Sequence, residues 1–374
     1  MNQNLIKPTS LVTLKNGLTL ALTPFPKIKT VTLHAWVGVG SSYEPKAING
    51  VSHFLEHMLF RGNEFLGDSN QLNLNMEELG GEINAATSFD HTEYWLEFHC
   101  NFLETGIKRF IQFLRFPTFE KIELERSIIL EELKSSYNEE NQIIDVDSLT
   151  LETFWPEDPF GFPVAGIPES INAITLKDLQ NWYNKYYQAS NMVIGITGDF
   201  DVAQIQKLLE AETTSLVSGE KQPYPNPTWT LPCKKPLNFV QERDNQYQFQ
   251  WSFPFPDLTP TKRMHLQLAL RMLDDGSSTR MQRLIREEKG LAYDISASPF
   301  FFSTGGLMQI QGIAGLDKIN ELVTELADII KGICEQGFNE SEFKLARLRF
   351  QTSLDCFSDN AEGLLLEAVS PLLH

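Results

Sequence analysis

Residues 31–60 read VTLHAWVGVGSSYEPKAINGVSHFLEHMLF, and the periodicity changes within this stretch. In its first part, residues 31–39, apolar side chains alternate with others, which is typical of a strand with one buried face. In its last part, residues 51–60, apolar side chains recur at helical spacing, and Gly62 follows where such a helix would end. A strand followed by a helix predicts a mixed fold of α and β elements.

Elements of both kinds are expected on either side of this stretch. Asn16-Gly17 lies between two alternating runs and predicts a two-residue hairpin turn, because both residues accept positive φ. Residues 82–100 predict a second hairpin, around Ser88-Phe89-Asp90. The remaining expected elements of this half are helices at 70–79, 101–115 and 119–138, a helix opening with a capping box at Thr175–Asp178, and a buried strand at 192–198.

A proline-rich stretch divides the chain. Residues 221–236, KQPYPNPTWTLPCKKP, hold five prolines, and neither a helix nor an inner strand can run through them. We therefore expect an N-terminal domain at 1–220, a linker at 221–236 and, at 237–374, a C-terminal domain of the same fold without its last elements. The order of elements recurs after the linker at a period of about 225 residues. The recurring elements are a strand at 246–255, helices at 260–274 and 278–288, strands at 291–303 and 305–314, and helices at 316–336 and 340–357.

The charge balance limits the classes of partner. Among 374 residues, 31 Lys and Arg stand against 49 Asp and Glu, a formal net charge of −18. Phosphate backbones and anionic lipids repel such a protein, so we expect no nucleic-acid and no membrane partner. No run of about 18–20 apolar residues predicts a membrane span, and no targeting segment is expected. Four widely spaced cysteines, expected to be free thiols, favour a reducing interior such as a bacterial cytoplasm: Cys100, Cys233, Cys334 and Cys356.

His53-Phe-Leu-Glu56-His57 lies inside the helix expected at 51–60. At 100° per residue its three polar side chains share one face, so both imidazoles can reach one metal ion with Glu56 beside it. The order is the inverse of the usual zinc-helix motif. Two neutral imidazoles suit Zn²⁺, and a catalytic site needs a third protein ligand and an open position for water. The alternative is that both histidines are ordinary buried residues and Glu56 is a surface carboxylate.

Spacing alone leaves the third ligand open. In the helix expected at 119–138, Glu125 and Glu132 are seven residues apart, two helical turns, and therefore share a face. One could bind the metal while the other supports a ligand from behind. Rival candidates by residue type are Glu123, Glu131, His91 and His99.

The motif at 53–57, followed by Glu132 in the stretch Glu125-Arg-Ser-Ile-Ile-Leu-Glu-Glu132, resembles the pitrilysin/insulinase family of zinc peptidases, and within it the single-chain branch similar to mitochondrial processing peptidase. The resemblance implies one Zn²⁺ per chain, with Glu132 rather than Glu131 as third ligand and Glu125 as a supporting carboxylate. It also implies an α+β fold of two similar α/β domains, each an antiparallel-rich sheet packed with helices, facing each other as a clamshell.

Residues 80–94, GGEINAATSFDHTEY, resemble the strand of this family that binds extended substrate as an additional strand. An edge strand offers unpaired N–H and C=O groups that suit any peptide backbone, although an ordinary surface hairpin has the same pattern. The substrate-binding residues that this resemblance implies are Asn84, Ala85, Ala86, Thr87 and Phe89.

In residues 286–293, REEKGLAY, Arg286 and Tyr293 resemble the arginine and tyrosine pair on the second domain of the family. They would donate to a substrate carbonyl and to the developing oxyanion. The function expected from all these stretches is a zinc endopeptidase of unfolded peptides in which Glu56 is the general base.

Two alternatives remain: a non-catalytic peptide-binding or assembly subunit of the same fold, and an active half that requires a paired homologous chain. Because one chain carries both the zinc motif and the Arg286/Tyr293 pair, self-sufficiency or a homodimer is favoured over the second alternative. The acidic balance weakly favours basic peptides as substrates, although surface charge also serves solubility.

Overall fold

The computed structural model describes residues 9–225, 227, 237–240, 246–302 and 305–373. Most of the proline-rich stretch, and with it Cys233, lies outside the described residues, whereas Cys100, Cys334 and Cys356 are free thiols. The chain divides into two compact units. Unit 1 comprises residues 1–136, 155–225 and 357–374, and unit 2 comprises residues 137–154 and 226–356. No helix in the described part of the chain is long and apolar enough to cross a membrane.

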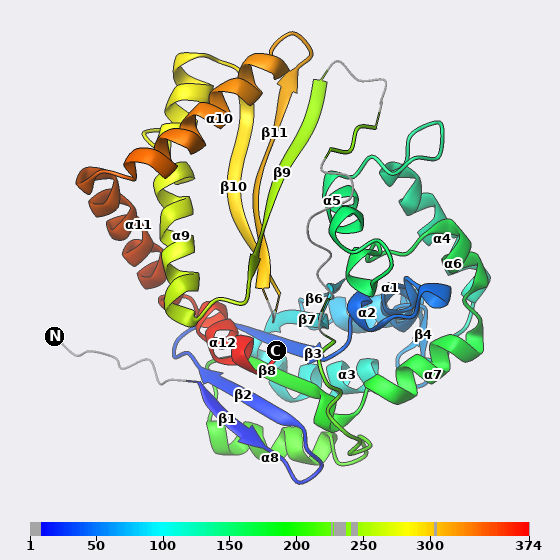
Figure 1. Cartoon of the computed structure of the whole chain (residues 1–374). Coiled ribbons are helices and arrows are strands. Elements are labelled where there is room, and N and C mark those ends of the chain that lie inside the picture. Colours follow the sequence, from blue (N-terminus) through cyan, green and yellow to red (C-terminus); the bar gives the residue numbers. More distant parts are fainter. Residues whose placement is uncertain (1–8, 226, 228–236, 241–245, 303–304, 374) are drawn as a thin grey trace, which may run out of the picture. The chain divides into compact units, whose positions relative to one another are not determined.

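Unit 1 contains a six-stranded sheet in the order β1-β2-β8-β3-β7-β6 (Figure 1). Only the β2–β8 pair is parallel. Both expected hairpins are confirmed, and the first turns at Gly17, whose φ of 92° suits glycine. The strands are β1 (Ser10–Thr13), β2 (Thr19–Pro24), β3 (Thr30–Val37), β6 (Glu82–Thr87), β7 (Thr92–His99) and β8 (Met192–Gly198), and a separate small ribbon is formed by β4 (Gly62–Asn63) and β5 (Gly67–Asp68).

Helices of unit 1 cover both faces of this sheet. Alternation along β3 places Leu33 and Ala35 in the main core, where both are fully buried. On the opposite face His34 and Trp36 are buried as well, because helix α12 from the far end of the chain packs on β2 and β8 (Figure 1). The helices are α1 (Val51–Leu59), α2 (Ser69–Glu77), α3 (Leu103–Arg115), α4 (Ile122–Leu133), α6 (Pro168–Ala173), α7 (Leu176–Tyr186), α8 (Val202–Glu212) and α12 (Ala361–Val369).

Unit 2 contains a three-stranded antiparallel sheet in the order β10-β11-β9. Its core forms between the sheet and its helices, with Ile295, Ile310 and Leu322 among the buried side chains. Helix α5 contacts β9, and Thr150 Oγ1 accepts a hydrogen bond of 2.9 Å from Gln250. The elements are α5 (Val146–Phe154), β9 (Gln246–Pro256), α9 (Pro260–Asp274), a π-helix (Gln282–Glu288), β10 (Ala292–Phe302), β11 (Gly305–Gly315), α10 (Ile319–Gln336) and α11 (Glu340–Ser358).

The expected α+β fold is confirmed, and the order of elements in unit 1 from β3 to α4 recurs in unit 2 from β9 to α11. The units differ from the expected ranges at two helices. Helix α5 belongs to unit 2 although it lies within 1–220, and α12 belongs to unit 1 although it lies within 237–374. Each helix packs on a sheet whose strands are remote in sequence, so sequence continuity does not reveal its unit. The clamshell arrangement stays a prediction.

Candidate metal centre and active site

Helix α1 presents the motif at 53–57 because its two faces differ in character. Phe54, Leu55 and Met58 are fully buried and fix the helix against unit 1. The face that carries His53 and His57 is only partly buried, with 12% and 21% of the two imidazoles exposed. The apolar spacing of α1 therefore aims both imidazoles away from the core.

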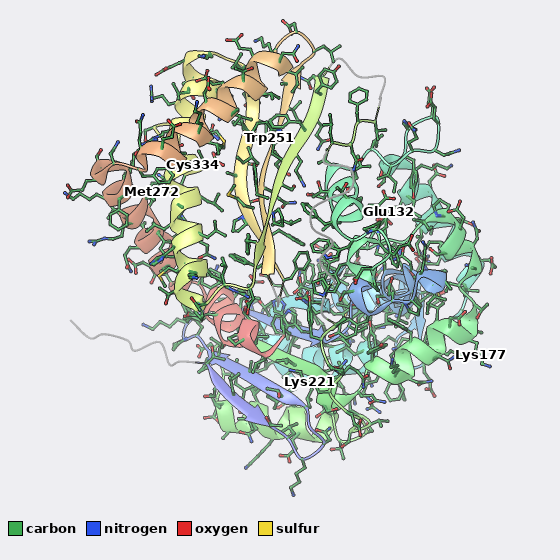
Figure 2. The ribbon with its side chains drawn as sticks, in the orientation of Figure 1. Glu132, Lys177, Lys221, Trp251, Met272 and Cys334 are labelled. Atoms are coloured by element: carbon green, nitrogen blue, oxygen red, sulfur yellow. The ribbon has the colours of Figure 1, made fainter. Side chains whose placement is uncertain are left out.

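Three side chains form a group that could hold a metal ion: His53, His57 and Glu132. Glu132, which is labelled in Figure 2, comes from α4. The Nε2 atoms of the two histidines lie 3.2 Å apart. Glu132 places its oxygens 3.8 Å from Nε2 of His53 and 3.7 Å from Nε2 of His57. Ligands about 2.0–2.1 Å from a common tetrahedral centre are about 3.3 Å apart, so this donor set fits one Zn²⁺.

Glu125 holds His57 from behind. Its side chain is 2% exposed, and Oε1 lies 2.8 Å from Nδ1 of His57. This contact leaves Nε2 of the same ring to face the metal group, as is usual for histidine ligands. The other oxygen of Glu125 forms an ion pair with Arg61, which was not singled out in the sequence. Arg61 lies four residues after His57, just beyond the end of α1, so both partners of the buried carboxylate come from one short segment of the chain.

His53 is kept neutral by its surroundings. Burial, and to a lesser extent the neighbouring charge of His57, lower the pKa of His53 to about 3 from the usual 6.5. A neutral imidazole is the form that binds a metal ion, so no proton on this ring competes with metal near neutral pH.

Glu56 points toward the edge strand of the sheet. It is 8% exposed, and the Thr87 hydroxyl donates to its Oε2 at 2.5 Å. Burial raises the pKa of Glu56, and the charge of Glu132 adds to the rise, while Thr87 and His57 oppose it. A carboxylate with a raised pKa is suited to accept a proton and return it. Thr87 thus holds this carboxylate, and its expected role in substrate binding stays a prediction.

Strand β6 lies at the edge of the sheet of unit 1 and contacts α1. Asn84 and Ala85 are half-buried and Ala86 is exposed, so the strand is accessible from one side. Phe89 lies beyond the strand, in the hairpin turn, where its carbonyl accepts hydrogen bonds from the backbone and the hydroxyl of Ser42 at 2.9 and 2.6 Å. The backbone of Phe89 is therefore engaged within the fold.

Within the part of the chain that the structure describes, the metal group does not include the other candidates for the third ligand. His91 contacts Asp90 at 2.7 Å, and Nδ1 of His99 accepts from the backbone of Asn101. Glu123 forms an ion pair with Arg126, and Glu131 forms one with Lys134.

Arg286 and Tyr293 belong to unit 2. The guanidinium of Arg286 stacks over the ring of Tyr293, 5.1 Å from its centroid. Tyr293 is 84% exposed. The two side chains are thus together and accessible on unit 2.

Comparisons with known proteins agree in one family. A model of the insulinase family (peptidase family M16) matches residues 20–165, and a model of the peptidase M16 inactive domain matches residues 173–350. An uncharacterized zinc protease of Rickettsia bellii is 30% identical over 353 residues, which cover 91% of this chain and 82% of the relative.

Solved structures share the fold. A protease from Helicobacter pylori has a TM-score of 0.88 at 20% identity, covering 98% of this chain and 90% of that one. The periplasmic protease PqqL from Escherichia coli has a TM-score of 0.73 at 22% identity, and the match covers 98% of this chain but 42% of PqqL.

The match at 20–165 includes every residue of the metal group, and the relative from Rickettsia bellii is similar along most of its length. The branch similar to mitochondrial processing peptidase stays a prediction. On the evidence of both halves, this chain belongs to the insulinase family of peptidases, peptidase family M16.

Proposed function

We propose that this protein is a zinc-dependent endopeptidase that cleaves extended peptides at the metal group of unit 1. The observation that carries the proposal is the convergence of His53, His57 and Glu132, whose donor atoms lie within 4.8 Å of one another, with Glu56 on the same helix face. Zinc bound there would lower the pKa of a water molecule toward about 7 and polarise a peptide carbonyl.

The residues of the chain would move the protons. Because Thr87 engages Oε2 of Glu56, we assign the proton transfer to Oε1, which would accept a proton from the water and deliver it to the leaving amine. Glu125 would keep the ring of His57 oriented throughout. Arg286 and Tyr293 would donate to the substrate carbonyl and the oxyanion from unit 2.

Substrate would bind as a further strand on β6. Pairing with Asn84, Ala85 and Ala86 uses the peptide backbone, so an extended segment of almost any sequence can bind. This mode requires an unfolded or short polypeptide, because a folded domain does not offer a free strand of backbone.

Hydrolysis of quenched fluorescent peptides by the zinc-loaded protein tests the proposal. We expect Glu56→Gln to keep one zinc per chain and to lower kcat by about 10²–10⁴-fold, because it removes the proton acceptor and keeps the ligands. Glu132→Gln should lose zinc, whereas the control Glu131→Gln, altered one position away, should keep both zinc and activity. Cleavage by zinc-loaded Glu56→Gln at the wild-type rate would contradict the role of Glu56.

A second candidate is a subunit that holds extended peptides without cutting them. The match of residues 173–350 to a domain described as inactive, and the coverage of less than half of PqqL, favour considering a paired homologous chain. Peptide binding without hydrolysis by a protein with one zinc per chain would support this candidate. Hydrolysis that begins only on addition of a homologous chain would identify an active half.

A further inference from the structure

Helix α1 begins without a capping side chain of its own. Its N-cap is Gly50, with φ of 89°, and no side chain there can accept from the first turn. A Cβ at this position would lie 2.8 Å from both the carbonyl oxygen of Ala165 and the Cα of Gly166. Real Cβ contacts are essentially never this short, so the usual Ser, Thr, Asp or Asn cap has no room. The acceptor for the first turn has to come from elsewhere.

Glu44 supplies that acceptor from six residues upstream of Gly50. Its carboxylate is fully buried. Oε2 accepts from the backbone N–H of Gly50 at 2.6 Å, and Oε1 accepts from the backbone N–H of Ser52 at 2.8 Å. Two of the N–H groups that a helix start leaves unpaired are therefore bound by one rigid carboxylate.

The same carboxylate joins α1 to the surrounding loops. Nδ2 of Asn49 donates to Oε2 of Glu44 at 3.1 Å and to the carbonyl of Pro163 at 3.0 Å. On the other side of the turn, Nε1 of Trp182 donates to the hydroxyl of Ser52 at 3.0 Å. The three partners of Glu44 are all donors, and they oppose the effect of burial, which raises the pKa of Glu44 to about 7.

The contacts of Glu44 with Gly50 and Ser52 lie next to the metal group in the chain. Ser52 immediately precedes His53, and His57 follows one turn later on the same rigid helix. A rotation of the first turn would move Nε2 of His53 relative to Nε2 of His57, and a metal site tolerates little change in ligand positions. We propose that Glu44 is a positioning residue of the metal centre, whose contacts with Gly50 and Ser52 set the presentation of His53. This inference rests on the proposed zinc site, and it does not depend on which peptide is cleaved.

Zinc affinity and the visible absorption of the Co²⁺-substituted protein test this role. Glu44→Gln keeps the shape of the side chain but turns an NH₂ group toward an N–H donor. We expect zinc affinity, measured by competition with a chromophoric chelator, to fall about 10–100-fold, as is typical when an outer partner of a metal site is lost. The ligand-field bands of Co²⁺ should shift, because they report the geometry of the ligands.

Asp201→Ala is the control, because it removes a helix cap remote from the metal group. Asp201 caps α8 by accepting from the backbone of Gln204 at 2.9 Å, and α8 carries no residue of the metal group. This variant should lower the urea midpoint of unfolding, as loss of a cap does, and leave both zinc affinity and the Co²⁺ spectrum unchanged. Asn49→Ala is the second variant, to be used if Glu44→Gln does not fold. It removes one donor to Glu44 and should weaken zinc binding several-fold.

Three outcomes overturn the inference. A lower unfolding midpoint for Glu44→Gln with zinc affinity and Co²⁺ spectrum equal to wild type would make Glu44 a structural cap only. The same result for Asn49→Ala, when Glu44→Gln does not fold, would lead to the same conclusion. Failure of the wild-type protein to bind zinc at all would contradict the proposed function together with this inference, whereas the first two outcomes leave the proposed function intact.

Discussion

At the scale of single residues, three buried carboxylates, one on α1 and two beside it, are held by different sets of donors. Glu44 accepts backbone N–H groups, Glu56 accepts a hydroxyl, and Glu125 lies between an imidazole and the guanidinium of Arg61. A buried carboxylate without such partners is costly, so these contacts fix the positions of the three side chains before a metal ion binds.

Removal of the charge behind His57 should weaken metal binding. In Glu125→Gln the Nδ1–H of His57 loses an anionic acceptor and Arg61 loses its ion pair, so we expect zinc affinity to fall about 10–100-fold. Chelator competition measures this change. Glu123→Gln, on the exposed side of the same helix, is the control and should bind zinc as the wild type does. Equal affinities in the two variants would remove the supporting role of Glu125.

The neutral state of His53 should appear in the pH dependence of stability. Its folded pKa of about 3 lies below the ordinary 6.5, so between these values the unfolded chain binds a proton that the folded chain does not. Stability of the metal-free protein should therefore rise with pH through this window, by up to about 1.4 kcal/mol per pH unit from this group. Urea unfolding at pH 5 and pH 7 should show a smaller difference for His53→Gln than for the wild type. Identical differences would show that His53 is not buried neutral.

At the scale of elements, periodicity predicted most helices and strands because their burial follows from local sequence. Helix α9 runs over Pro260–Asp274, as expected, since Thr259 caps it and proline fits its first turn. The wholly apolar run at 192–198 is the fully buried strand β8. Helices α5 and α12 were not expected, because each packs against strands that are far away in the sequence.

The candidate site, like the helices and strands, could be predicted only where it depends on local sequence. The spacing of His53, Glu56 and His57 is a local property of one helix, and the structure keeps the three on one face. The contacts of Arg61 with α4 and of Glu44 with the start of α1 join segments outside any short pattern. Glu44 in particular lies too far before Gly50 to match a capping box, so only folding brings the two together.

Packing of α12 on the sheet of unit 1 should be measurable through one leucine. Leu365 is fully buried in the cluster that includes Ala21, Trp36 and Val193. Leu365→Ala should destabilise the protein by about 2–5 kcal/mol, because it leaves a cavity between helix and sheet. Leu348→Ala on α11, where the side chain is 63% exposed, is the control and should change stability by about 0.5 kcal/mol or less. Urea unfolding compares the two, and equal effects would contradict the packing of α12.

At the scale of the whole molecule, the two units are joined by more than a linker. Residues 137–154 contribute α5 to unit 2, and residues 357–374 contribute α12 to unit 1. His34 on β3 lies 3.2 Å from Glu362 on α12, and this contact lowers the pKa of Glu362. Neither half of the sequence therefore holds all the elements of its own unit.

A fragment that contains only the N-terminal half should show that unit 1 depends on α12. A fragment of residues 1–225 lacks α12 and should bind a hydrophobic dye such as ANS, since Trp36 and Val193 lose their cover. A synthetic peptide of residues 357–374 should suppress dye binding and raise the urea midpoint of the fragment. The same peptide with Leu365→Ala is the control and should do so less effectively. A fragment that is as stable alone as with the peptide would contradict the role of α12.

The return of α12 to unit 1 also bears on synthesis. A ribosome releases the chain from its N-terminus, so β2, β3 and β8 leave the exit tunnel long before α12 is translated. One face of their sheet then stays uncovered while residues 226–356 of unit 2 are made, and exposed apolar surface of this kind is what chaperones bind. Unit 1, which carries the candidate metal group, would thus reach its mature stability only after translation of residues 226–356 and of α12 is complete.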